Sequence, residues 1–107
     1  VVEGPETWPM VLEILAPWIN TIDIKDFTWD LTDKSRVVSV PLGQGLVPFD
    51  EFLEKLKTLE IRTDFSIHYE YPLGGAEKGR SELAISRDAF TEQVSSDLKF
   101  LNSYLAR

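Results

Sequence analysis

Polar and apolar residues alternate without interruption over residues 64–71. The polar set is Asp64, Ser66, His68 and Glu70, and the apolar set is Phe65, Ile67, Tyr69 and Tyr71. Successive side chains of a β-strand point to opposite faces, so the pattern predicts a strand with one covered face and one polar face. The polar face carries the only histidine of the chain beside a carboxylate, which makes it a candidate site. An antiparallel strand with one face in water gives the same alternation.

Alternation also occurs earlier in the chain, over residues 19–27, where two isoleucines lie between polar residues. We therefore predict a second strand, whose polar face carries Asp23 and Lys25. A helix between the two strands would make them a parallel βαβ unit, in which the two polar rows point to the same side.

Apolar residues at helical spacing predict three helices. The first begins at Thr7 and ends near Pro17, and the second begins at Pro48. Ser86 is a plausible N-cap for the third. The apolar stripes that we expect to be buried are Trp8, Val11, Leu12, Leu15 and Trp18; Phe49, Phe52, Leu53, Leu56 and Leu59; and Phe90, Val94, Leu98, Leu101 and Leu105.

Residues 28–47 form a long connection between the first strand and the second helix. Connections of this length usually contain function or structure of their own, and the valine-rich residues 37–40 suit a short edge strand. Gly43 and Gly45 suit positive φ or a close approach of backbone to a ligand, and a plain turn explains them equally well.

Composition limits the class of protein. The 107 residues are the size of a single domain, 1–107, and alternating helices and strands predict an α/β architecture with a mostly parallel sheet. The net charge is −7, with 18 acidic and 11 basic residues. This balance argues against nucleic acid or an anionic membrane as the main partner, because phosphate binding needs clustered Lys and Arg.

The compartment is less constrained by the sequence. The chain has no cysteine, which excludes disulfides and thiolate metal sites. We see no apolar run long enough to span a bilayer and no signal peptide, and we expect a cytoplasmic location. The sequence opens on Val1 rather than on Met, which leaves room for residues upstream.

Several segments of the chain together carry a resemblance to a known family. They are Trp8-Pro9 and residues 11–19, Ile22-Asp23-Ile24-Lys25-Asp26-Phe27-Thr28-Trp29, Pro41-Leu42-Gly43-Gln44-Gly45, and Ser66-Ile67-His68-Tyr69-Glu70-Tyr71. In this order and spacing they resemble the C-terminal part of the sugar phosphate isomerase/epimerase family, whose members are xylose-isomerase-like TIM barrels. Each motif is short and weak by itself, and the resemblance rests on their order and spacing together.

The resemblance implies the last part of a (β/α)8 barrel, from helix 6 to helix 8 with strands 7 and 8. A complete barrel needs about 250 residues, so two strands cannot close one. We therefore expect the chain to be a fragment of a longer enzyme or, less favoured, a unit that assembles as a homo-oligomer. We expect no catalytic activity from the isolated chain and an exposed apolar surface on Ile22 and Ile24.

The family also implies a divalent metal ion, such as Mn²⁺, Mg²⁺ or Zn²⁺. The ion polarises the oxygens of a sugar or sugar phosphate while a carboxylate moves a proton. By position, His68 falls where the strand 8 ligand is usually Glu, and Asp23 where the strand 7 ligand is often His. With Glu70, these residues are the metal ligands that the resemblance implies, and both departures retain residue types that bind divalent ions.

Catalysis and substrate binding fall on the same strands by this resemblance. Glu70 and Lys25 are the expected catalytic residues, and the expected substrate contacts are Lys25, Asp26, Trp29 and Arg36. Structural explanations stand beside these: an ion pair between Asp23 and Lys25, a cap of the strand end or a hold on Lys25 for Asp26, and rim packing for Trp29 and Arg36. His68 could likewise be a core histidine whose ring nitrogens are hydrogen-bonded and which has no role in a site.

Two other function classes remain open. A non-catalytic α/β binding domain derived from such a barrel would explain why Asp23 and His68 depart from the family's ligands. A DNA-repair nuclease shares this barrel superfamily, but the acidic balance and the lack of a Lys/Arg cluster argue against it.

Overall fold

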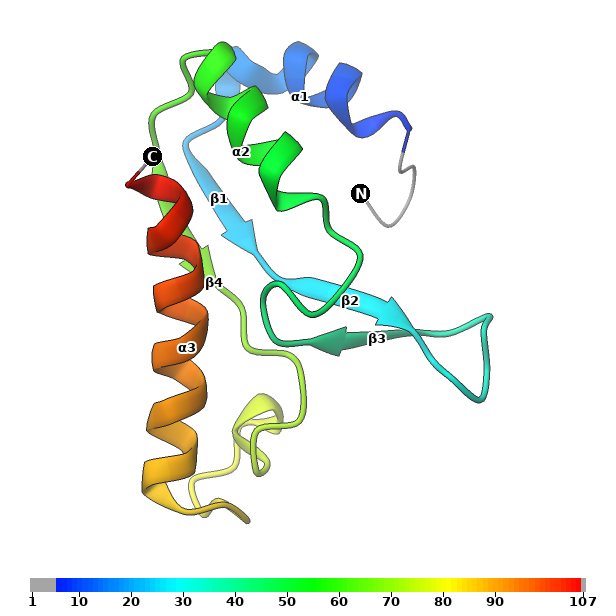
Figure 1. Cartoon of the computed structure of the whole chain (residues 1–107), viewed down its shortest axis with the longest axis vertical. Helices are drawn as coiled ribbons and strands as arrows, with labels where there is room; N and C mark the ends of the chain where they lie inside the picture. Colours follow the sequence, from blue (N-terminus) through cyan, green and yellow to red (C-terminus); the bar gives the residue numbers. More distant parts are fainter. Residues whose placement is uncertain (1–5, 107) are drawn as a thin grey trace.

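The computed structural model describes residues 6–106 as three α-helices, four short strands and two 3₁₀ turns (Figure 1). In chain order they are α1 (Trp8–Leu15), η1 (Ala16–Trp18), β1 (Thr21–Ile24), β2 (Asp26–Trp29), β3 (Val37–Val40), α2 (Phe49–Thr58), β4 (Asp64–Ile67), η2 (Ala76–Lys78) and α3 (Arg87–Leu105). None of the helices within residues 6–106 has both the length and the apolar character needed to cross a membrane.

The strands form two separate two-stranded sheets. β1 pairs with β4 in parallel, with Thr21 opposite Asp64 and Ile24 opposite Ile67. β2 and β3 form an antiparallel hairpin that extends away from the first sheet (Figure 1). The predicted parallel pair with a helix between its strands is confirmed, as is the edge strand at residues 37–40. The fold is thus mixed α/β, and the described part of the chain contains no closed barrel.

Both predicted long strands are shorter in the structure. Residues 19–27 contain two strands, β1 and the start of β2, with a break at Lys25. The chain leaves one sheet there and enters the other, because Ile24 pairs with β4 whereas Asp26 pairs with Val40 of β3. The strand predicted over residues 64–71 is shorter, because β4 ends at Ile67. The next residue, His68, still donates its N–H to the Ile24 carbonyl at 2.8 Å.

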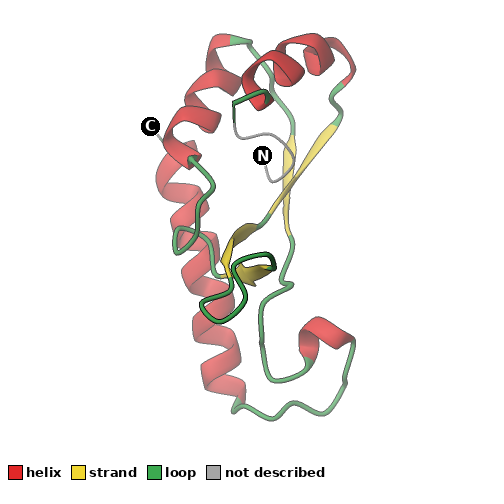
Figure 2. Cartoon of the chain, turned by 90° about the vertical axis from the view of Figure 1, so that its right-hand side faces the viewer, coloured by secondary structure: helices red, strands yellow, loops and turns green. Residues whose placement is uncertain are grey.

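The ends of α2 and the start of α3 follow the expected local chemistry, whereas the Thr7 hydroxyl makes no capping hydrogen bond at the start of α1. The Ser86 hydroxyl accepts a hydrogen bond from the Ala89 N–H at 3.1 Å, which confirms it as the N-cap of α3. α2 begins directly after Pro48, with acidic residues in its first turn and lysines in its last, an arrangement that the helix dipole favours. α3 runs along most of the length of the molecule, and the short β1/β4 pair lies beside only part of it (Figure 2).

One buried cluster joins all three helices to the first sheet. It consists of Leu12, Ile24, Leu42, Phe49, Leu53, Leu56 and Leu101. The expectation that Ile22 and Ile24 form an exposed apolar surface is wrong, because Ile24 is 3% exposed in this core and Ile22 packs against it.

The exposed apolar surface lies on other elements. It includes Met10, Val11, Ile14, Leu15 and Trp18 of α1 and η1, and Leu98 and Leu105 of α3. Five of these belong to stripes that we expected to be buried, namely Val11, Leu15, Trp18, Leu98 and Leu105. Helical spacing identifies an apolar face but not whether a neighbour covers it, and within residues 6–106 none of these five side chains belongs to the core cluster or to the residues packed against it.

Candidate functional site

Four charged or titratable side chains meet where β1 and β4 end. Parallel pairing puts the carboxyl ends of both strands at the same edge, and the register sets Asp23 opposite Ser66. Lys25 follows β1 directly, and His68 and Glu70 follow β4. The structure therefore brings together Asp23, Lys25, His68 and Glu70, which we call the polar cluster, as the sequence predicts.

Lys25 and Glu70 form the closest contact of the polar cluster. The Lys25 ammonium donates to both carboxylate oxygens of Glu70, at 3.0 and 3.1 Å. Both side chains are about half exposed. The hydrogen bond from Lys25 holds the pKa of Glu70 below its usual range; partial burial opposes this effect, and the charges of Lys25 and His68 add to it. Glu70 is therefore an ionised carboxylate at neutral pH.

His68 lies between the two carboxylates. Its Nε2 is 3.4 Å from Oδ1 of Asp23, and its Nδ1 is 3.7 Å from Oε1 of Glu70. The two nitrogens of an imidazole point in different directions, and each can donate or accept one hydrogen bond or bind one ion. The ring thus faces one carboxylate with each nitrogen.

This geometry decides which predicted metal ligands fit one ion. Two ligand atoms that are each about 2.1 Å from a tetrahedral ion lie roughly 3.4 Å apart, which matches the separation of Asp23 Oδ1 and His68 Nε2. Glu70 faces the other nitrogen, and Lys25 occupies both of its oxygens. Asp23 and His68 therefore fit as a two-residue donor pair, and within residues 6–106 no three acidic or histidine side chains are arranged around one ion position.

Asp26, the neighbour of Lys25, points away from solvent. Its side chain is buried, and its two oxygens accept hydrogen bonds from four backbone N–H groups, those of Phe27, Gly43, Gly45 and Val47, at 2.8–3.2 Å. A carboxylate has about four acceptor positions, so these bonds occupy its capacity. The structure gives Asp26 a loop-holding position in place of the expected access to a substrate.

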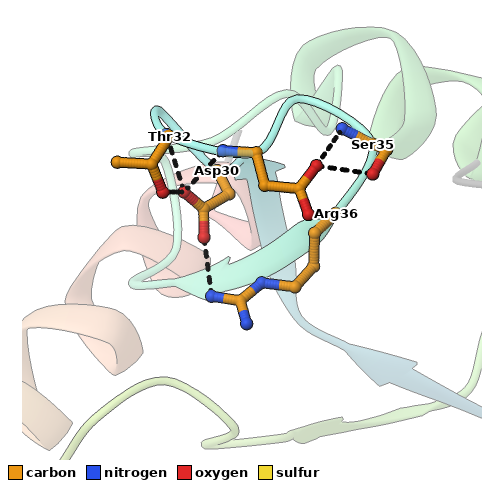
Figure 3. Close-up of polar contacts among 5 residues, drawn as sticks. Asp30, Thr32, Ser35 and Arg36 are labelled. Carbon is orange, nitrogen blue, oxygen red and sulfur yellow. Dashed lines mark hydrogen bonds and ion pairs between the residues drawn. The ribbon is translucent and has the colours of Figure 1, made fainter.

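Trp29 and Arg36 lie on the β2–β3 hairpin, apart from the polar cluster. The turn between these strands is organised by Asp30, whose Oδ1 accepts from the N–H and hydroxyl of Thr32 and whose Oδ2 accepts from Arg36 at 2.6 Å (Figure 3). These bonds, led by the Thr32 hydroxyl, hold the pKa of Asp30 well below its usual range. Trp29, at the end of β2, is about half exposed.

The sequence reasoning missed a second buried carboxylate, Asp97 in the middle of α3. The Tyr71 hydroxyl donates to its Oδ2 at 2.6 Å, and the Gln93 amide donates to its Oδ1 at 3.4 Å. Burial, and next the bond and charge of Asp97, raise the pKa of Tyr71. The available signal was an acidic residue on the helix face between Val94 and Leu101, where an apolar residue is expected.

A hollow of about 230 Å³ is lined by the loop that Asp26 holds, the start of α2 and the C-terminal part of α3. It is lined by Gly43, Gly45, Val47, Pro48, Phe49, Asp50, Glu51, Phe100 and Tyr104. Three of these nine residues are aromatic, and none of the four residues of the polar cluster lines the hollow. The polar cluster is therefore the main candidate site. Comparisons of the chain with protein-family models, curated proteins and solved structures found no match.

Proposed function

We propose that the chain is the C-terminal part of a (β/α)8 barrel and supplies part of the active site of a divalent-metal-dependent sugar or sugar phosphate isomerase or epimerase. The observation that supports this most is the meeting of Asp23, Lys25, His68 and Glu70 at the carboxyl ends of two parallel strands. In barrels of this type, the catalytic groups lie at that end of the strands.

The free edges of the first sheet also favour a larger assembly. Within residues 6–106, β1 and β4 pair only with each other, so each strand has an outer edge with no strand beside it. Parallel sheets occur almost only with several strands and with both faces covered. Further strands, from the same polypeptide or from a second copy, would pair with these edges and place additional ligands beside the polar cluster.

In this proposal, Asp23 and His68 hold the metal ion, through Oδ1 and Nε2. When bound, the ion supplies polarisation of the substrate's carbonyl and hydroxyl oxygens. Glu70 is assigned to proton transfer rather than to the ion, because Lys25 occupies both of its oxygens.

Lys25 and Glu70 have complementary roles in the proposed isomerisation. Glu70 accepts the proton from the carbon next to the substrate carbonyl, the C–H electron pair forms the C=C bond of an enediolate, and the carbonyl π pair becomes the negative charge on the carbonyl oxygen. That oxygen takes the proton of the neighbouring hydroxyl group, whose oxygen becomes the new carbonyl oxygen as the C=C pair takes the proton back from Glu70 at the former carbonyl carbon. Glu70 is a weak base while Lys25 donates hydrogen bonds to it, because these bonds lower its pKa. When substrate binds, the Lys25 ammonium turns to a substrate oxygen, and the pKa of Glu70 rises, which makes Glu70 a stronger base.

A non-catalytic sugar-binding or interaction domain is the second candidate. The specific observation in its favour is that the described chain offers only two donors to one ion and pairs its best base with a lysine. Carboxylates, an imidazole and an ammonium at a strand edge also serve to bind hydroxyl groups without chemistry.

The two candidates are separated by a measurement of Mn²⁺ binding to the 107-residue chain. Binding is detected as a loss of the free-ion signal in electron paramagnetic resonance. We expect binding of one ion, weakened at least tenfold in both Asp23→Ala and His68→Ala. Asp64→Ala is the matched control, because Asp64 is an exposed carboxylate at the opposite end of β4. Equal binding by all four proteins, or none by any, would reject the metal site and favour the second candidate.

The proton-transfer assignment needs an activity measurement on the assembled enzyme. Sugars and sugar phosphates are incubated with it in D₂O, and deuterium entering the carbon next to the carbonyl is followed by NMR. Glu70→Gln is expected to abolish this exchange while leaving Mn²⁺ affinity within about twofold, since Glu70 is not assigned to the ion. Exchange that survives Glu70→Gln would remove Glu70 as the base.

A further inference from the structure

Asp26 holds a loop to the start of β2 through its buried carboxylate. The side chain is 1% exposed. Oδ1 accepts from the N–H groups of Phe27 at 2.8 Å and Val47 at 3.2 Å, and Oδ2 from those of Gly43 at 3.0 Å and Gly45 at 2.9 Å. Hydrogen bonds to an ionised acceptor are about twice as strong as neutral ones, so the four bonds make this a firm attachment.

The loop sequence is fitted to this attachment. A Cβ on Gly45 would overlap both Oδ1 of Asp26 and the carbonyl oxygen of Phe27. That carbonyl also accepts a hydrogen bond from the Leu46 N–H at 2.8 Å. Gly43 has a φ of 83°, and a Cβ there would overlap the ring of Phe100. The Gly-x-Gly spacing thus allows the backbone to come within reach of the carboxylate.

Lys25 occupies the turn between the two sheets. Ile24 before it is the last residue of β1 and is buried, and Asp26 after it is the first residue of β2 and is also buried. The direction in which the Lys25 side chain leaves the backbone is therefore set by how these two neighbours are held. The first sheet holds Ile24, and the four N–H groups hold Asp26.

We propose that Asp26 is a positioning residue, which fixes the backbone at Lys25 so that the Lys25 ammonium reaches Glu70. A lysine side chain is long and flexible, so a contact at its end depends on a fixed starting direction. What this inference means for catalysis rests on the proposed function. The dependence of the Lys25–Glu70 contact on Asp26 does not.

The test uses Asp26→Asn in the 107-residue chain. Asparagine keeps the size of the side chain but replaces one acceptor oxygen by an NH₂ group, so two of the four N–H groups lose their partner. Two NMR readouts are recorded: the exchange rates of the Gly43, Gly45 and Val47 amides, and the nuclear Overhauser effect between the ε-methylene of Lys25 and the γ-methylene of Glu70.

The matched control is Asp30→Asn. Asp30 also accepts several hydrogen bonds and directly follows β2, but it organises the distant hairpin turn (Figure 3). We expect Asp26→Asn to speed exchange of the three loop amides about tenfold or more. We also expect it to remove most of the Lys25–Glu70 Overhauser effect, whereas Asp30→Asn changes neither.

Two results would overturn the inference. If the loop amides exchange faster while the Lys25–Glu70 Overhauser effect is unchanged, Asp26 holds the loop only. If neither readout changes, the carboxylate does not hold the loop at all. Should Asp26→Asn not fold, Gly45→Ala tests the same attachment from the loop side and is judged by the same readouts. No metal is added, so a failure of Mn²⁺ binding rejects the proposed function without affecting this result.

Discussion

Removal of the Tyr71 hydroxyl is the sharpest test of the packing between α3 and the segment after β4. Asp97 is 1% exposed and Tyr71 is 4% exposed, so water does not replace a lost partner at this contact. The Tyr71 hydroxyl is 2.6 Å from Oδ2 of Asp97, whereas the second donor, the Gln93 amide, lies at 3.4 Å from the other oxygen. Tyr71→Phe therefore leaves one carboxylate oxygen buried without its donor.

The expected loss of stability follows from that contact. A hydrogen bond to a charged group contributes about 1.5–3 kcal/mol, and an unsatisfied buried acceptor adds a desolvation cost, so we expect Tyr71→Phe to lower the free energy of unfolding by about 2–3 kcal/mol. For a domain of this size, 1 kcal/mol shifts the melting temperature by about 4–8 °C, which puts the expected decrease at roughly 10–20 °C.

Urea unfolding followed by circular dichroism measures this difference, with Tyr69→Phe as the matched control. The Tyr69 hydroxyl donates to the Val94 carbonyl at 3.5 Å, a long contact, so its removal should cost less than about 1 kcal/mol. Adding Asp97→Leu to Tyr71→Phe should recover part of the loss, since an apolar pair leaves nothing unsatisfied. Equal costs for the two Tyr→Phe variants would refute the reasoning.

The same contact predicts a dependence on alkaline pH. The pKa of Tyr71 is raised in the folded chain, mainly by burial and then by Asp97, above the value of about 10 in the unfolded chain. Stability is therefore fully present below pH 10 and decreases as the pH rises beyond it. Tyr71→Phe should flatten this decrease, which is measurable as the urea midpoint across the alkaline range.

Three further predictions concern the loop, the polar cluster and the hairpin. Gly45→Ala should cost about 2–3 kcal/mol in urea unfolding, because the new methyl group overlaps backbone and carboxylate; a cost near zero would mean that the loop does not lie on Asp26. A double-mutant cycle with Lys25→Met and Glu70→Gln should give a coupling of only about 0.2–1 kcal/mol, because both side chains are half exposed; a larger coupling would indicate that the pair is covered in solution. The hairpin turn at Asp30, whose pKa is lowered, should stay closed above about pH 4 and open as the pH falls further, with loss of protection at the Thr32 amide; loss at neutral pH would contradict the turn.

Residue periodicity was sufficient to predict the parallel pair and the meeting of the polar cluster. Alternation identifies strands, and a helical segment between two of them favours parallel pairing, which aligns their carboxyl ends. The pattern also contained the break at Lys25. Apolar residues are two apart at Ile22 and Ile24 but three apart from Ile24 to Phe27, so the alternation changes phase at the residue where the chain changes sheet.

The position of Asp26 could not be read from that pattern. A carboxylate next to a strand is usually exposed, and its burial depends on N–H groups brought by a loop about twenty residues further along the chain. The exposure of Val11 and Leu15 has the same kind of cause. Periodicity marks them as an apolar face, but only the arrangement of distant elements decides whether anything covers that face.

The free strand edges and the polar cluster are linked by electrostatics. Strands added beside β1 and β4 would remove water from side chains that are now about half exposed. Lys25 and Glu70 would remain neutralised by each other, but the one ionic contact of Asp23 within residues 6–106 is to His68, and burying a carboxylate without a full partner costs several kcal/mol. Under the proposed function, a divalent ion shared by Asp23 and His68 would offset that cost. The strands that complete the proposed barrel would then strengthen metal binding, so on this proposal the described chain should bind the ion more weakly than the assembled protein.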